Sequence, residues 1–167
     1  MIYEAELINS IRDFMVAKKY TLSVAESVTS GHLQAAFSSA TEASKFYQGG
    51  ITAYNAGQKS RHLGIDPIWA MEEDSVSEKI AADMAINVNK LFLSDYSIAI
   101  TGYATPVPEK GVYDLFAFFA IAFRDHIVSS TRITSNKKDP VEAQLDYTTQ
   151  IVRAMHQLLE KKYARTV

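Results

Sequence analysis

The chain has 167 residues, 47% hydrophobic and 22% charged, with a net charge of −2 and no cysteine. This composition is typical of one globular domain over residues 1–167, and the near-neutral charge argues against a nucleic-acid partner. The absence of cysteine excludes disulfides and thiolate catalysis. We expect a cytoplasmic protein with no membrane partner, since the sequence has no signal-peptide pattern and no apolar stretch of membrane-spanning length.

Helix and strand patterns alternate through the first half of the chain. The predicted elements are a helix over 2–19, a strand over 21–25, a helix over 32–40, a strand over 49–54 and a short helix that contains Lys59 and closes at Gly64. A further short helix opens at Asp66-Pro67, because proline is favoured at the first helical position.

The second half adds a helix and a strand and then an antiparallel pair. The predicted elements are a helix over 79–93 with Ser77 as its N-cap, a strand over 96–101, strands over 112–124 and 126–135 joined by a tight hairpin at Asp125-His126, and a helix over 140–164. The strand over 126–135 alternates in polarity, which is typical of a sheet edge. This order predicts an α/β fold, a three-layer α/β/α sandwich with a mixed β-sheet.

Polar turns follow three of the predicted strands, after Ala25, Tyr54 and Thr101. We expect these turns to converge at one edge of the sheet, where open α/β sheets bind their ligands. Ser27 lies where a strand ends and a helix begins, so backbone N–H groups of the first helical turn can face an oxyanion or a phosphate. The alternative is that Ser27 and Thr29 only cap a helix.

Metal and cofactor sites are not indicated by the sequence. The four histidines have no second histidine or carboxylate at metal-ligand spacing; they are His32, His62, His126 and His156. The glycines are too few for a phosphate-binding loop, and the turn at Ser27 is not G-x-S-x-G. We therefore expect no metal and no cofactor.

Ser27 and Lys59 remain as candidates for chemistry. A serine hydroxyl needs a base to take its proton, and a lysine amine can do this where burial keeps it neutral near pH 7. The alternative is that Lys59 is an ordinary surface lysine. Tyr54 either hydrogen-bonds to this pair or ends a strand with its hydroxyl in water.

Several segments match one family pattern in order and with near-identical spacing. Residues 24–31 match T-A-E-S-C-T-G-G, residues 50–59 match G-x-x-x-Y-S-N-x-x-K, residues 74–78 match G-A-V-S-E, residues 101–106 match T-G-I-A-G-P, and residues 109–113 follow where the family has K-P-V-G-T-V. The chain thus resembles the C-terminal domain of CinA and its stand-alone relatives, the nicotinamide mononucleotide amidohydrolases, over nearly its whole length.

The resemblance implies hydrolysis of the carboxamide of nicotinamide mononucleotide to the acid and ammonia, without a metal. Ser27 matches the nucleophile, Lys59 the general base and Tyr54 the tyrosine beside them, so the resemblance implies that these three form the catalytic group. The substrate-binding residues that it implies are Thr29, Ser30, Gly31, Gly50, Asn55, Thr101 and Gly102.

The chain departs from the family pattern at several positions. Ser30 replaces the first glycine of a pair, Asn55-Ala56 replaces Ser-Asn, and Thr105 stands where the family has glycine. The glycine-rich loop that follows is reduced to Val107-Pro108. These departures leave three alternatives: a nucleotide amidase, an amidase for a smaller amide, and an inactive CinA-like domain that binds a ligand or partner.

The expected partner is a small nucleotide or amide substrate. Three aromatic residues, Tyr47, Trp69 and Tyr113, are candidates for an exposed subunit interface, so a homo-oligomer is a further expectation.

Overall fold

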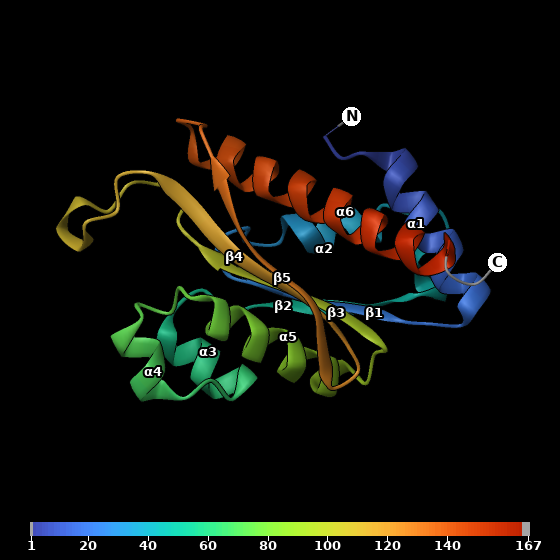
Figure 1. Ribbon diagram of the computed structural model, residues 1–167, viewed down its shortest axis with the longest axis horizontal. Coiled ribbons are helices and arrows are strands. Elements are labelled where there is room, and N and C mark those ends of the chain that lie inside the picture. Colours follow the sequence, from blue (N-terminus) through green and yellow to red (C-terminus); the bar gives the residue numbers. More distant parts are fainter. Residues whose placement is uncertain (1, 165–167) are drawn as a thin grey trace.

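A five-stranded sheet forms the middle layer of the molecule, with strand order β2-β1-β3-β4-β5 (Figure 1). The structure is a computed structural model and describes residues 2–164. The strands are β1 (Leu22–Glu26), β2 (Tyr47–Thr52), β3 (Tyr96–Gly102), β4 (Leu115–Phe123) and β5 (His126–Ser135). The strand β1 pairs in parallel with β2 and β3, whereas β4 and β5 are antiparallel, so the predicted mixed sheet is confirmed.

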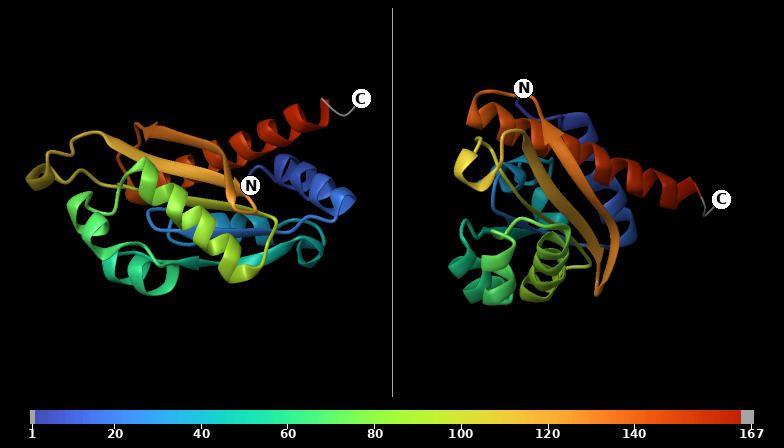
Figure 2. Two further views of the ribbon diagram at one scale, coloured as in Figure 1. Left: turned by 60° about the horizontal axis from the view of Figure 1, so that its bottom comes forward. Right: turned by 60° about the vertical axis from the view of Figure 1, so that its left-hand side comes forward.

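Helices cover both faces of this sheet, as the predicted three-layer sandwich requires (Figures 1 and 2). The helices are α1 (Ala5–Lys18), α2 (His32–Ser38), α3 (Ala56–Leu63), α4 (Pro67–Glu72), α5 (Glu78–Phe92) and α6 (Pro140–Ala164). One face carries α1, α2 and α6, and the other carries α3, α4 and α5. Two 3-10 turns, at Ala43–Lys45 and Pro108–Lys110, lie in the connections.

The predicted helix boundaries follow from capping chemistry. The Ser77 side chain accepts a hydrogen bond from the Ile80 amide at the start of α5, and the Asp66 side chain does the same for the Ile68 amide in α4. Gly64 ends α3 with φ at +61°, a conformation that glycine adopts without steric cost. The predicted short helix that closes at Gly64 is therefore confirmed.

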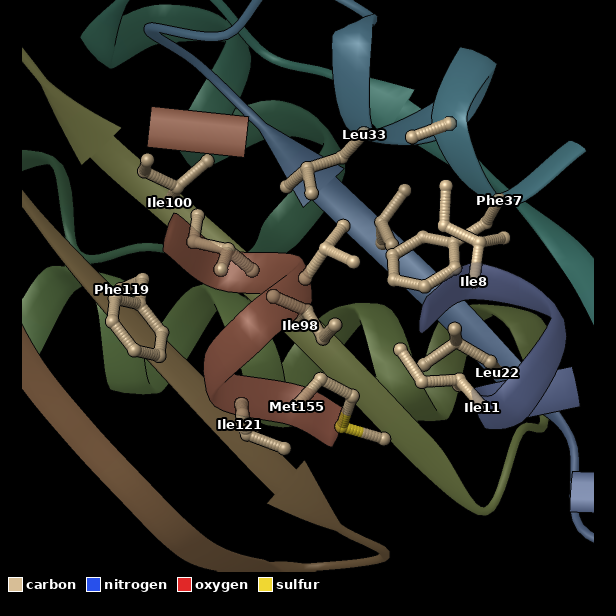
Figure 3. Close-up of a cluster of buried hydrophobic side chains, with 14 of the residues drawn as sticks. Ile8, Ile11, Leu22, Leu33, Phe37, Ile98, Ile100, Phe119, Ile121 and Met155 are labelled. Carbon is tan, nitrogen blue, oxygen red and sulfur yellow. The ribbon is translucent and has the colours of Figure 1, made fainter. Parts of the chain in front are cut away.

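Two hydrophobic clusters, one on each face of the sheet, hold the layers together. Figure 3 shows the larger cluster, which includes Ile8, Leu33, Phe37, Ile98, Ile100, Phe119 and Met155. The strands turn smaller residues to the other face, where Ala25, Ala99, Ala120 and Ala122 lie in the second cluster, together with apolar residues of α5. Small side chains on this face let α5 pack close to the sheet, beneath the strand ends that carry the polar turns.

Two strands, β2 and β4, have boundaries that differ from the prediction by two residues or more. The strand predicted over 112–124 begins at Leu115, because Val112 instead pairs with Val107 in an isolated bridge. The strand predicted over 49–54 covers Tyr47–Thr52, so Gly50 lies within it. A Cβ on Gly50 would lie 2.5 Å from the Val24 side chain, so glycine is needed there for close packing rather than for a turn.

The strand β5 lies at the edge of the sheet, as predicted.

Among residues 2–164, no helix combines the length and the apolar character needed to cross a membrane.

Candidate active site

The three polar turns meet at one end of the sheet, around a cleft of about 570 Å³. They meet because β1, β2 and β3 run parallel, which brings their carboxyl ends to the same edge. The cleft lining includes Ser27, Tyr54, Asn55, Lys59, Asp74 and Gly102. The predicted convergence of the turns is confirmed, and the residues that it brings together include both proposed reactive groups.

Ser27 sits at the end of β1 with its side chain at the cleft. Its amide donates to the Ile100 carbonyl of β3 at 3.1 Å, which continues the strand pairing by one residue. Its Oγ donates to the Tyr54 carbonyl at 3.4 Å, and only 5% of the residue is exposed. The nucleophile candidate is thus held between the ends of the neighbouring strands.

Glu26, directly before Ser27, organises the turn that follows. Its buried carboxylate accepts hydrogen bonds from Thr29 Oγ1 at 2.6 Å and from three amides at the start of α2. These amides belong to Gly31 (3.1 Å), Leu33 (2.9 Å) and Gln34 (2.8 Å). The alternative that Ser27 and Thr29 only cap the helix is wrong, because the carboxylate of Glu26, from the preceding strand, accepts the hydrogen bonds of these otherwise unpaired amides.

This arrangement changes which amides can stabilise an oxyanion. Glu26 occupies the amides of Gly31, Leu33 and Gln34, and the His32 amide donates to the Thr29 carbonyl. The amides of Val28 and Thr29 donate to no group in the hydrogen bonds of residues 2–164. Val28, which directly follows Ser27 and lines the cleft, is therefore the candidate donor. Ser30 adopts φ of +47°, so the serine that replaces a family glycine still forms the turn.

The Glu26 carboxylate is expected to stabilise this turn measurably. Replacing Glu26 with glutamine removes the charge and points an amide group at one of the N–H donors, so the free energy of unfolding should fall by about 2 kcal/mol. Urea denaturation measures the change. The exposed Glu6→Gln serves as the control, and an equal effect of the two substitutions would contradict the assigned role.

Lys59 lies inside the molecule on α3, with 2% of the residue exposed. Its Nζ donates to Thr101 Oγ1 at 3.0 Å and to the Ser75 carbonyl at 3.2 Å, and Thr101 Oγ1 donates to the same carbonyl at 2.5 Å. Burial lowers the pKa of Lys59 to about 8, although the negative charge of Asp74 acts in the opposite direction. The alternative of an ordinary surface lysine is therefore wrong.

Ser27 and Lys59 share the cleft but do not hydrogen-bond to each other. The Ser27 hydroxyl is directed to the Tyr54 carbonyl, and the Lys59 amine to Thr101 and Ser75. Proton transfer between them would therefore require rotation of the serine side chain or a bridging water molecule.

Burial of Lys59 predicts that the free energy of unfolding rises with pH between about 8 and 10. The folded protein releases the Lys59 proton near pH 8, whereas an unfolded chain holds it to about 10.5. The unfolded state therefore binds more protons in this window, and rising pH favours the folded state by about 2–3 kcal/mol. Urea denaturation at pH 8 and pH 10 measures the rise.

The Lys59→Met variant should lack this rise, and an undiminished rise in the variant would contradict the prediction. Above pH 10 the opposite effect begins, because burial raises the pKa values of Tyr47 and Tyr147 and favours their release of protons in the unfolded chain.

Some of the other predicted site residues also reach the cleft. Tyr54 lines it, but its side chain is 69% exposed, and its carbonyl rather than its hydroxyl contacts Ser27. Asn55 lines the cleft and caps α3 through the Gln58 amide. Gly102 lines the cleft where a Cβ would lie 2.4 Å from the Ala117 Cβ.

The remaining predicted site residues lie outside the lining of the cleft. Thr101 is buried and contacts Lys59, so it supports the amine from within. Thr29, Gly31 and Ser30 belong to the turn beneath Ser27, and Gly50 packs between β1 and α2. The structure does not place these four against a ligand in this cleft.

Asp74, Tyr103 and Lys110 also line the cleft, and sequence reasoning did not identify them. The Asp74 carboxylate accepts a hydrogen bond from Tyr103 Oη at 2.7 Å and forms an ion pair with Lys110. The contacts span 29 and 36 residues of sequence, and no motif or spacing signals them.

The shortened loop after β3 has its own ordered structure. The Val107–Val112 bridge closes it around the 3-10 turn, and the Tyr147 hydroxyl of α6 donates to the Tyr103 carbonyl at 3.0 Å. Val107 and Lys110 both face the cleft. The replacement for the glycine-rich segment therefore still supplies part of the cleft lining.

A family model for the CinA C-terminal domain matches residues 4–160 of the chain. The chain belongs to the CinA C-terminal domain family. Among curated relatives, it is 29% identical over 164 residues to a CinA-like protein of Chlorobium chlorochromatii, covering 96% of this chain and 38% of the relative. It is 30% identical over 155 residues to Protein MG115 of Mycoplasma genitalium, covering 92% of this chain and 97% of the relative.

Solved structures of CinA proteins share this fold. The competence damage-inducible protein A from Klebsiella pneumoniae subsp. pneumoniae MGH 78578 aligns with a TM-score of 0.87 at 24% identity, covering 93% of this chain and 96% of that one. A CinA superfamily protein from Klebsiella pneumoniae 700603 aligns with a TM-score of 0.83 at 28% identity, covering 96% and 98%. This CinA domain spans between 20% and 38% of the length of three CinA-like relatives.

The histidines of this CinA domain lie apart from the cleft lining. His32 hydrogen-bonds to the Tyr3 hydroxyl and His156 to the Ser10 hydroxyl, each at 3.0 Å. Across residues 2–164 no group of three His, Cys, Asp or Glu side chains is arranged to hold a metal ion.

Proposed function

We propose that this CinA domain is an amidohydrolase that converts nicotinamide mononucleotide, or a related small amide, to the acid and ammonia. Ser27 is the nucleophile and Lys59 the general base. The observation that carries the proposal is a buried lysine, its pKa lowered to about 8 by burial, on the same cleft as a serine at the end of a strand. An amine of this kind is neutral in part of the population at physiological pH, which a general base must be.

The proposed reaction uses the arrangement of these groups directly. Neutral Lys59 takes the hydroxyl proton as Ser27 Oγ attacks the carboxamide carbon, and the Val28 amide stabilises the oxyanion, a contribution worth about 3 kcal/mol. The Lys59 ammonium then protonates the leaving nitrogen, the C–N bond of the tetrahedral intermediate breaks, and ammonia departs to leave an ester on Ser27. Water attacks this ester with Lys59 again as base, which releases the acid and restores Ser27.

The cleft has room for the proposed substrates. Its volume of about 570 Å³ lies in the usual range for small-molecule sites, roughly 300–1,000 Å³. Besides Lys59, the lining contains one carboxylate and one further lysine, Asp74 and Lys110, which are paired with each other. A nucleotide and a smaller aromatic amide therefore both remain in the proposal.

Ammonia release by the purified chain tests the proposal. The substrates are nicotinamide mononucleotide, nicotinamide and a panel of other small amides, with the acid product identified by mass spectrometry. Turnover of nicotinamide mononucleotide alone would assign a nucleotide amidase, and turnover of a smaller amide would assign the related reaction. If none of these substrates releases ammonia, the proposed amidase activity is rejected.

A second candidate is a CinA-like domain that binds a ligand or partner without turnover. The absence of a hydrogen bond between Ser27 and Lys59 favours it. Calorimetric binding of nicotinamide mononucleotide without ammonia release would support this candidate over the first.

Self-association remains a prediction. Of the three aromatic residues expected at an interface, Trp69 is 43% and Tyr113 70% exposed. Tyr47 is instead partly buried, with its ring beside Phe37 and Phe46. The absence of a nucleic-acid partner also stays a prediction, based on the net charge of −2.

A further inference from the structure

The turn between α4 and α5 has an unusual backbone conformation. Asp74 and Ser75 are consecutive residues with φ of +49° and +59°. These values lie in the left-handed region of the backbone, which residues other than glycine, asparagine and aspartate rarely adopt. The family pattern that residues 74–78 match has glycine at the first of these positions. This chain places a carboxylate there, in the wall of the cleft.

Contacts on both sides hold this turn in place. The Ser75 amide donates to the Ala70 carbonyl at 2.7 Å, and the Ser75 hydroxyl donates to the same carbonyl at 3.1 Å. On the other side, the Asp74 carboxylate is bound by Tyr103 and Lys110 of the loop after β3. The left-handed turn is thus fixed between α4 and that loop.

The same turn holds the amine of Lys59. The Ser75 carbonyl accepts hydrogen bonds from Lys59 Nζ at 3.2 Å and from Thr101 Oγ1 at 2.5 Å. A shift of this carbonyl would remove one of the two acceptors of the amine. The position of Asp74 therefore determines the position of the group that orients Lys59.

Asp74 is also the only carboxylate among the residues that line the cleft in the described chain. The other ionisable groups there are Lys110 and Tyr103 from the loop after β3 and Tyr54 from the turn after β2; the lining residues from β1 and α6 carry none. Burial raises the pKa of Asp74, but hydrogen bonds from Lys110 and Tyr103 outweigh burial and keep it below its ordinary value. Asp74 is therefore ionised at neutral pH.

We propose that Asp74 is a positioning residue for Lys59. Held by Tyr103 and Lys110, Asp74 fixes the Ser75 carbonyl against the lysine amine and directs a negative charge toward that amine. The inference rests on the proposed function of Lys59 as general base. It assigns the shortened loop a role in the reaction beyond lining the cleft, because that loop supplies both partners of Asp74.

The test is the titration of Lys59 in two variants that should shift it in opposite directions. NMR of 13C-labelled lysine, with the Lys59 signal assigned from Lys59→Met, follows the midpoint without any substrate. Asp74→Asn keeps a residue that tolerates the left-handed region but removes the charge, so the midpoint should fall below that of the native protein. Lys110→Met removes a cation that neutralises Asp74, so the midpoint should rise.

The opposite signs separate this role from a general loosening of the cleft. Loosening would admit water to Lys59 and raise the midpoint in both variants. An unchanged or raised midpoint in Asp74→Asn would overturn the proposal. If Asp74→Asn does not fold, Asp74→Gly replaces it, because glycine adopts the left-handed region without steric cost and also removes the charge. A lowered midpoint in Asp74→Gly supports the proposal, and an unchanged or raised one overturns it.

Enzyme assays then link the titration to the reaction. In Asp74→Asn the ratio of amide hydrolysis at pH 7 to that at pH 9 should increase about two-fold or more, because more Lys59 is neutral at pH 7. Glu73→Gln, at an exposed neighbouring carboxylate, is the matched control and should leave the ratio unchanged. Shifted midpoints with no hydrolysis by the native protein would reject the amidase activity but keep the role of Asp74. Hydrolysis with unshifted midpoints would keep the amidase activity but reject the role of Asp74.

Discussion

Replacement of Ser27 by alanine is expected to reduce amide hydrolysis by about three orders of magnitude or more. The variant retains the cleft and the candidate oxyanion amide of Val28 but has no hydroxyl to form the ester. The fold should be preserved, because the Ser27 side chain makes only one long hydrogen bond, at 3.4 Å to the Tyr54 carbonyl. Ammonia release at saturating substrate measures the loss.

Ser38→Ala is the matched control for this substitution, since Ser38 is an exposed serine on α2, away from the cleft. It should retain native activity. If Ser27→Ala kept a tenth or more of the native rate, Ser27 would not be the nucleophile, and the attacking group would have to be a water molecule.

The second large effect is expected for Lys59→Met, which should lose activity to a similar degree without losing stability. Methionine matches the length of the lysine stem but cannot accept the serine proton. At pH 7 the native protein holds a buried amine that is mostly protonated, and replacing a buried charge with an apolar side chain is usually neutral or stabilising. The free energy of unfolding at pH 7 should therefore stay equal or rise, by roughly 1–3 kcal/mol.

Comparison with Lys90→Met, at an exposed position in the last turn of α5, controls for the loss of a lysine as such. The double variant of Ser27 and Lys59 should be no less active than Ser27→Ala alone, because residues that act as one unit give non-additive losses. Additive losses would show that the two residues act independently.

Much of the fold follows from local patterns in the sequence. The end of α3 at Gly64 and the start of α5 after Ser77 are determined by capping, which depends on residues within one helical turn. Alternating polarity identifies β5 as an edge strand. The start of β4 was missed because Val112 pairs across a short loop with Val107, a contact that no apolar pattern distinguishes from a strand.

The candidate site was only partly predictable, for a related reason. Parallel strands bring their carboxyl ends together, so the nearness of Ser27 and Lys59 follows once the strand order is known. The role of Glu26 was missed because an acidic residue at the end of a strand is not a usual helix cap. The turn at Asp74 lacks the glycine that commonly marks a left-handed backbone, and its partners are distant in sequence.

The helix α4, which forms one wall of the cleft, is much less buried than the part of the protein that surrounds Lys59. Ala70 is the one buried residue of this helix, whereas Ile68 and Met71 are 66% and 78% exposed. Substitutions at exposed positions usually change stability by less than about 0.5 kcal/mol. Mutations at exposed positions of α4 should therefore change the cleft wall, which this helix lines through Met71, at little cost to folding. Under the proposed function, such changes would alter the preferred amide while Lys59 stays in place.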